Sequence, residues 1–93
     1  MAVLVVLPGA LREYAKGAET VRGKGRTLAA VLADLEARYP GLRQRVLADT
    51  GAFREYVNVF VNGDQVLQAD PAKVRVKDGD TVHILPSVAG GLE

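Results

Sequence analysis

Residues 27–41 read TLAAVLADLEARYPG, and this stretch decides the fold class of the chain. Thr27 is the expected N-cap, because its hydroxyl can accept a free backbone amide of the first helical turn. Pro40-Gly41 ends the helix, since proline excludes helical geometry at the residue before it. Between these signals, apolar side chains recur with the spacing of one helical stripe: Leu28, Val31, Leu32, Leu35 and Tyr39. The stretch therefore predicts one amphipathic helix, and 42–47 could add a further turn.

Short apolar segments on both sides of this helix have the composition of β-strands. Val57, Val59 and Val61 alternate with Tyr56, Asn58 and Phe60, so this segment presents two different faces. Asn62-Gly63 is a favoured pair for a tight turn into the next strand. Residues 8–17 are expected to form a loop with one helical turn, and 73–76 a half-buried segment. The predicted strands are 3–7, 18–22, 55–61, 65–67 and 81–85.

Two strands, a helix and two or three more strands pack most simply as one mixed sheet with the helix across one face. A right-handed crossover places the first strand beside the last as a parallel central pair. The sequence thus predicts an α+β protein of the β-grasp (ubiquitin-like) fold, with a four- to five-stranded sheet. A chain of 93 residues forms one domain, which we expect to cover 1–91 and to end in a flexible tail over 86–91.

Composition argues against several classes of function. The chain has no cysteine and a single histidine, so a thiolate or histidine-rich metal site is not expected. Twelve basic and eleven acidic side chains nearly cancel, which does not indicate a nucleic-acid partner. The apolar opening lacks a basic region before it and stops at Pro8, unlike a signal peptide. No segment approaches the length of a membrane helix, and we expect a cytoplasmic protein.

The possible enzyme motifs fail on spacing. Ser87 and His83 are the only serine and histidine, and four residues of extended strand put them about 13 Å apart. Residues 23–27 do not have the spacing of a phosphate-binding loop, and Asp78-Gly79-Asp80 is too short for a calcium loop. We therefore expect a chain that is not an enzyme and that binds no cofactor of its own.

The C-terminal segment is the most informative functional feature. Six extended residues from Pro86 to Gly91 span about 20 Å. The pair Gly90-Gly91 has no side chains, so such a tail could thread a narrow channel and present a carboxylate there. A frayed end is the alternative explanation of the same residues.

A second candidate site lies on the predicted sheet. If the helix covers the valine face, Phe60, Tyr56 and His83 share the other face and could form an exposed patch for a partner. Two alternatives remain: His83 is an ordinary solvent-facing histidine, or the 8–17 loop covers Phe60.

The whole chain resembles the ubiquitin-like sulfur carriers. This family includes the small subunit of molybdopterin synthase, the thiamine-pathway carrier and the carrier used in cysteine biosynthesis. The resemblance rests on the Asn-rich strand and turn, the Asp-Gly-Asp turn, and the ending Val88-Ala89-Gly90-Gly91. These segments are residues 56–63, 78–82 and 84–91. Residues 53–58 and 85–91 look most like the cysteine-biosynthesis carrier, with the molybdopterin subunit close behind.

The resemblance implies a mechanism and a set of partners. An E1-like enzyme adenylates the Gly91 carboxylate with ATP, and a sulfur donor then displaces AMP to leave a thiocarboxylate. Val88, Ala89 and Gly90 would thread the partner's channel. The sulfur acceptor would be a pyridoxal-phosphate cysteine synthase or a molybdopterin-synthase large subunit, and in the cysteine branch a zinc metalloprotease releases the product. The carrier itself supplies no acid or base.

Leu92-Glu93 departs from the family pattern, because working members end at the second glycine. The pair is either an extension that a metalloprotease clips or a remnant of cloning. Two rival functions also remain open. One is a protein modifier joined to lysines through Gly91, and the other is a β-grasp interaction module with an inert tail.

Overall fold

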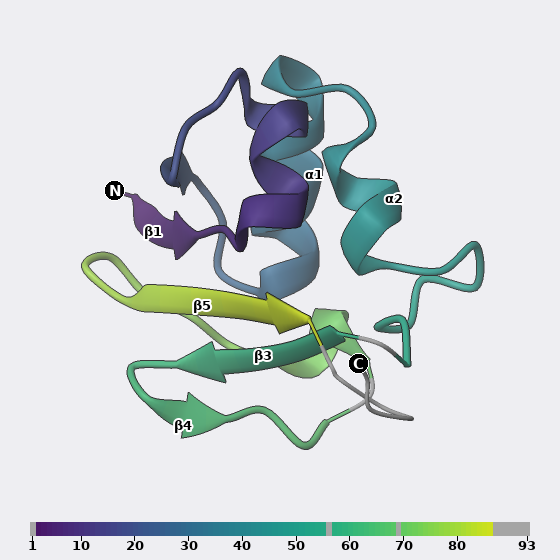
Figure 1. Ribbon diagram of the computed structural model, residues 1–93. Helices are drawn as coiled ribbons and strands as arrows, with labels where there is room; N and C mark the ends of the chain where they lie inside the picture. The colour runs from purple at the N-terminus through teal and green to yellow at the C-terminus, as the bar shows by residue number, and fades with distance from the viewer. Residues whose placement is uncertain (1, 56, 69, 87–93) are drawn as a thin grey trace.

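The computed structural model describes residues 2–55, 57–68 and 70–86, which form one five-stranded sheet with its main helix on one face (Figure 1). The strands lie in the order β2-β1-β5-β3-β4. In chain order the elements are β1 Val3–Val6, 3₁₀-helix η1 Gly9–Ala15, β2 Thr20–Gly23, α1 Leu28–Arg38, α2 Leu42–Val46, β3 Val57–Val61, β4 Asp64–Gln65, 3₁₀-helix η2 Pro71–Lys73 and β5 Thr81–Pro86.

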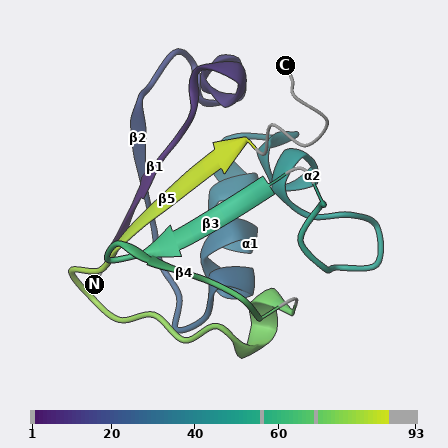
Figure 2. The same ribbon diagram turned by 60° about the horizontal axis from the view of Figure 1, so that its bottom comes forward.

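The first and last strands pair in parallel, as the sequence predicts. The register runs from Leu4 opposite Thr81 to Val6 opposite His83. The remaining strand pairs are antiparallel, and β5 occupies the middle of the sheet. Figure 2 looks onto the sheet, with α1 lying across its far side. The predicted β-grasp arrangement is confirmed.

Helix α1 confirms the stripe predicted from its spacing. The Thr27 hydroxyl caps it by accepting a hydrogen bond from the Ala30 amide at 3.1 Å. Four members of the stripe are buried, and Tyr39 packs at its end against the same core. Burying four such aliphatic side chains contributes roughly 1.5–3 kcal/mol each, less the entropy of ordering them. The helix therefore holds one face of the sheet away from water.

Helix α2 is the extra turn expected after Pro40. Its first turn is capped from α1, because the Glu36 carboxylate accepts the amides of Gly41 and Arg43, both at 2.9 Å. These two hydrogen bonds, of which the one from Gly41 has the larger effect, hold the pKa of the Glu36 carboxyl below its usual value. One side chain thus joins the two helices.

Several strand boundaries differ from the prediction: the first strand ends at Val6 rather than at residue 7, and Glu55 lies in a turn before the third strand rather than in it. The fourth strand is Asp64–Gln65 rather than 65–67, because Asn62 and Gly63 have positive φ angles of 51° and 89° and reverse the chain within two residues. Likewise the second strand is Thr20–Gly23 rather than 18–22.

The segment expected at 73–76 is half-buried as predicted, with Val74 and Val76 buried and Lys73 and Arg75 exposed. It begins in η2. Backbone hydrogen bonds with Leu28 and Arg26 tie it to the start of α1, which turns its valines inward.

The predictions for the 8–17 loop and for the start of the tail need correction as well. Residues 8–17 form a seven-residue 3₁₀-helix rather than a single turn, with Leu11 and Tyr14 packed against the core. Pro86 belongs to β5, opposite Val57, and not to the tail.

Candidate functional site

The face of the sheet that turns away from α1 brings the predicted surface residues together. Phe60 on β3 lies directly opposite His83 on β5, and His83 is also the register partner of Val6 on β1. Side chains at such cross-strand positions point to the same face and touch. The prediction that Phe60 and His83 share a surface is therefore consistent with the register, while Tyr56 lies outside the described residues.

This surface is apolar around an exposed histidine. Phe60, Val6 and Leu4 are half-buried, and Leu85 is 44 % exposed. The next residues along these strands, including Val59, Val82 and Ile84, are buried beneath α1. We call Leu4, Val6, Phe60, His83 and Leu85 the open sheet face. Apolar side chains gathered on the exposed side of a sheet are typical of a partner surface.

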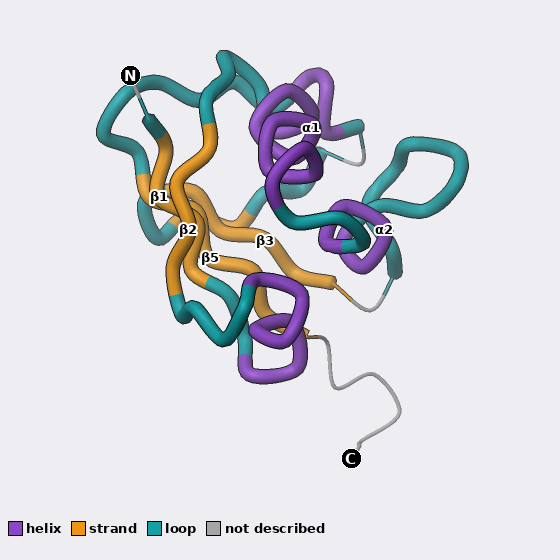
Figure 3. Tube along the Cα trace, turned by 90° about the horizontal axis from the view of Figure 1, so that it is seen from above, coloured by secondary structure: helices purple, strands orange, loops and turns teal. Residues whose placement is uncertain are grey.

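Residues 8–17 meet the sheet at another place. The residues of η1 line a small pocket of about 160 Å³ at the end of β5, and its walls include Pro8, Leu11, Val57, Leu85, Arg45 and Arg54. We call this the strand-end pocket. Figure 3 shows the backbone of η1, the helix without a label, beside the end of β5. Phe60 is not among its lining residues. Sequence reasoning missed the pocket, because its walls come from four separate segments.

The opposite end of β5 is fixed by a buried carboxylate. Asp80, which is 7 % exposed, accepts hydrogen bonds from the Asn62 side chain and the Lys77 amide, both at 2.9 Å. The Asn62 contact, followed by the Lys77 amide, holds the pKa of the Asp80 carboxyl below its usual value of 3.8. The Asn62 carbonyl oxygen accepts the Thr81 amide. This network sets where β5 begins and hence where it delivers the chain at its other end.

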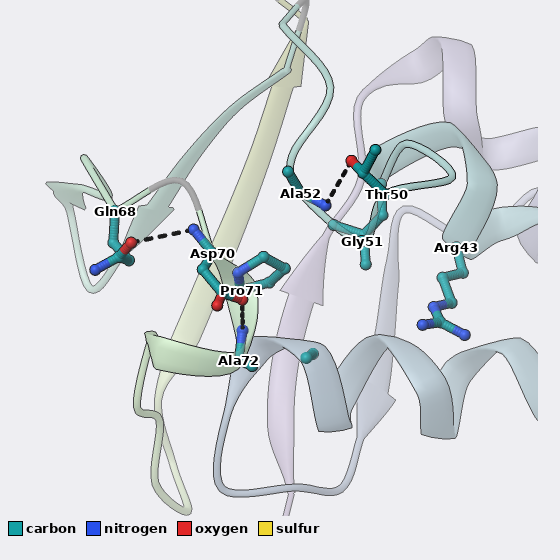
Figure 4. Close-up of a pocket in the computed structure, with 10 residues that line it drawn as sticks. Arg43, Thr50, Gly51, Ala52, Gln68, Asp70, Pro71 and Ala72 are labelled. Atoms are coloured by element: carbon teal, nitrogen blue, oxygen red, sulfur yellow. Dashed lines mark hydrogen bonds between the residues drawn. The ribbon is translucent and has the colours of Figure 1, made fainter.

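Another pocket, of about 470 Å³, opens between the 50–52 loop and the segment before η2 (Figure 4). Its polar side chains are not arranged for catalysis. Thr50, Gln68 and Asp70 each accept an amide of their own loop, from Ala52, Asp70 and Ala72 respectively. Its polar atoms therefore shape the two loops. Across the described ranges there is also no group of acidic, histidine or cysteine side chains that could hold a metal ion.

The predicted reactive residues are not part of this geometry. Val88, Ala89, Gly90 and Gly91 lie outside the described residues. They follow the end of the central strand β5, which lies beside the strand-end pocket and the open sheet face. None of the helices in residues 2–55, 57–68 and 70–86 has the length and hydropathy needed to span a bilayer.

The model of the ThiS family matches residues 5–91. The chain belongs to the ThiS family. Curated relatives cover the chain almost completely: the sulfur carrier protein CysO of Mycobacterium tuberculosis is 40% identical over 93 residues, which are 98% of this chain and 100% of that protein. Small archaeal modifier protein 3 of Haloferax volcanii is 43% identical over 65 residues, 70% of each chain.

Solved structures show the same fold for the ThiS-family chain. The crystal structure of Mycobacterium tuberculosis CysO has a TM-score of 0.85 at 38% identity and covers 92% of this chain and 99% of that one. A chain of the Amycolatopsis orientalis BexX/CysO complex has a TM-score of 0.86 at 39% identity, with 97% and 100% covered. These similarities confirm the predicted family and the β-grasp fold.

Proposed function

We propose that this chain is a sulfur carrier that works through a thiocarboxylate at Gly91. The observation that carries the proposal is the 40% identity to CysO sulfur carriers over nearly the whole chain. The family match also runs through to residue 91 and so includes the glycine pair. The chain itself catalyses nothing and binds no cofactor: it offers a surface and a carboxylate.

The chemistry at Gly91 takes two steps. A carboxylate oxygen attacks the α-phosphorus of ATP on an E1-like partner, so that pyrophosphate leaves and an acyl-adenylate forms. A sulfur nucleophile then attacks the acyl carbon and AMP leaves with the bonding electron pair of the C–O bond. When the sulfur is hydrosulfide, the product is the thiocarboxylate and no oxidant is needed. The adenylate makes this possible because AMP is a far better leaving group than oxide.

The open sheet face is the proposed docking surface for the partners. Phe60 and Leu85 supply apolar area, and His83 supplies a polar group between them. Aromatic anchors of this kind carry much of the binding energy at protein interfaces. Its position on β5 supports this role, because a partner seated there lies next to the point where the tail begins.

A pyridoxal-phosphate cysteine synthase is the favoured sulfur acceptor, since CysO proteins are 40% identical to this chain over 98% of its length. A molybdopterin-synthase large subunit is the second choice. A metalloprotease that releases product from the carrier completes the proposed set of partners, and we place the protein in the cytoplasm, where these enzymes work.

The proposal requires Gly91 to be the end of the chain. With Leu92-Glu93 attached, Gly91 sits in a peptide bond and has no carboxylate to adenylate. Removal of these two residues is thus the first step if they are native, and their omission is the right design if they are a cloning remnant.

Intact-mass spectrometry tests the proposal. The chain ending at Gly91 is incubated with its E1-like partner, ATP and sulfide, and we expect one oxygen to be replaced by one sulfur only when ATP is present. A mass that never changes in the presence of an active partner would contradict the carrier function.

A protein modifier is the second candidate, favoured by the 43% identity to small archaeal modifier protein 3. It uses the same activated Gly91 but transfers the acyl group to a lysine amine. Conjugates on lysines in cell extracts, with no thiocarboxylate formed, would favour it. A Gly91→Ala change impairs both functions, whereas a β-grasp module with an inert tail would be unaffected.

A further inference from the structure

The strand-end pocket combines apolar and positively charged side chains. It has a volume of about 160 Å³, with an apolar floor of Pro8, Leu11, Val57 and Leu85, and two arginines also line it. Leu85 is the penultimate residue of β5, so the pocket adjoins the place from which residues 87–91 continue. A partner that receives the tail must therefore approach this end of β5.

The two arginines are held in place by contacts other than ion pairs. The Arg45 guanidinium lies 4.7 Å from the centroid of the Tyr14 ring, and the Arg54 side chain donates to the Gln44 carbonyl oxygen. The ion pairs found among the described residues involve Arg12 and Arg38 instead. Both charges are therefore oriented and uncompensated within the described part of the chain, which reduces the entropy lost when an acidic group binds them.

This combination fits one kind of ligand. An apolar floor flanked by two guanidinium groups complements a peptide segment in which an apolar side chain lies beside Asp or Glu. The reach of the tail adds a geometric limit, since the five residues 87–91 span only about 17 Å when fully extended. The enzyme that adenylates Gly91 must therefore contact the carrier close to the end of β5.

We propose that the strand-end pocket binds an acidic segment of the activating enzyme, with an apolar side chain in the pocket and carboxylates on Arg45 and Arg54. This rests on the function proposed above and adds the chemistry of the partner's contact. The pocket adjoins the open sheet face, with which it shares Leu85, and differs from it in offering two positive charges.

The test measures activation kinetics on the chain ending at Gly91. ATP–pyrophosphate exchange by the E1-like enzyme of the same organism is followed as the carrier concentration is varied. For the double variant Arg45→Glu/Arg54→Glu we expect the KM for the carrier to rise about tenfold or more with kcat little changed, because charge reversal repels the acidic segment. Lys73→Glu/Arg75→Glu is the matched control, since both side chains are exposed in or just after η2, neither lines the strand-end pocket or belongs to the open sheet face, and the change in net charge is the same.

A second variant tests the pocket without changing charge. Ala10 is exposed at the pocket wall, and Ala10→Trp fills the space that the partner's apolar side chain would take. We expect this variant also to raise the KM, with circular dichroism and thermal unfolding showing that the fold is kept.

The possible outcomes separate the two proposals. If the unaltered chain supports no exchange, the proposed function fails and the inference with it. If exchange occurs and the arginine variants behave like the control, the function stands and the inference is wrong. A lower KM in the double variant would also overturn it, because that result would mean that the arginines hold the chain's own C-terminus.

Discussion

At the scale of single residues, the hydrogen bonds around Asp80 show how a sequence motif fixes the position of β5, the strand from which the tail continues. Asp80 is a buried carboxylate that fixes the turn before β5 to the turn after β3 through Asn62. Removing a partner from a buried hydrogen bond costs about 1–3 kcal/mol, because the remaining polar groups stay unsatisfied.

We predict that Asp80→Ala lowers the free energy of unfolding by about 1–3 kcal/mol. The effect depends on pH. The pKa of Asp80 is lowered in the folded chain, so the ionised carboxylate stabilises the fold above the unfolded value of about 3.8, and this contribution is lost as pH falls through the lowered pKa. Urea unfolding at neutral pH and at several acidic pH values measures both effects.

The matched control is Asp49→Ala, which removes an exposed carboxylate that accepts no hydrogen bond among the described residues. If both variants lose the same stability, or if the Asp80 variant keeps the full acid dependence of the unaltered chain, the role assigned to Asp80 is wrong.

Gly23 gives a second prediction at this scale, because it lies where β2 passes closest to α1. A Cβ placed there would sit 2.7 Å from the Cγ1 atom of Val31 and 3.1 Å from Val31's carbonyl oxygen. Val31 is fully buried and has no room to move. We expect Gly23→Ala to destabilise the fold by about 1–3 kcal/mol in thermal or urea unfolding. Gly9→Ala, where a Cβ meets nothing within 4 Å, should change stability little.

At the scale of elements, the sequence predicts the long, periodic segments and misses the contacts between segments. The stripe from Leu28 to Leu35 specifies α1, because burial against the sheet and the helical period agree. Thr27 was identified as its cap for the same local reason. Nothing local indicates that Glu36 caps a different helix, since its partners Gly41 and Arg43 become available only once the chain turns after Pro40.

The capping of α2 yields a prediction. Glu36→Ala leaves the amides of Gly41 and Arg43 without a side-chain acceptor, so we expect a loss of about 1 kcal/mol in the free energy of unfolding. Glu36→Gln retains one acceptor oxygen and should lose less. Glu13→Ala, an exposed glutamate of η1, serves as the control in the same unfolding assay.

In the candidate site too, local sequence predicts one part, the sheet surface, and does not predict the other, the strand-end pocket. Alternation along β3 predicts that Phe60 faces away from the helix, and the register with His83 follows from the strand pairing. The strand-end pocket was not predictable, because Leu11, Arg45, Arg54 and Leu85 come together only through the packing of η1 against the end of the sheet.

At the scale of the whole molecule, β5 connects the site to the fold. It is the central strand, its buried side packs beneath α1, its outer side carries His83 and Leu85, and its end continues into the tail. A partner that binds the sheet therefore lies next to the strand from which the tail continues. The proposed function requires this arrangement, because the tail has to be presented from a fixed place on the sheet.

The docking role of the open sheet face is tested by Phe60→Glu. Phe60 is not part of the buried core, so stability should change little, whereas losing an aromatic anchor costs binding about 2 kcal/mol, roughly thirtyfold in affinity. Isothermal titration calorimetry with the sulfur-accepting enzyme measures the change. Ala37→Glu places the same charge at an exposed position of α1 and should leave binding unchanged. Equal losses in the two variants would contradict the assigned surface.

The central claim, that sulfur is carried on Gly91, is tested most directly by locating the sulfur atom. The chain ending at Gly91 is treated with its activating enzyme, ATP and sulfide, and then digested with trypsin. Cleavage after Lys77 releases residues 78–91 as one C-terminal peptide. We expect fragmentation to place one sulfur, in exchange for one oxygen, on Gly91, and to find none when ATP is omitted or when the chain extends to Glu93. Sulfur at any other residue, or an unmodified peptide from an enzyme that is active on ATP, would contradict the account.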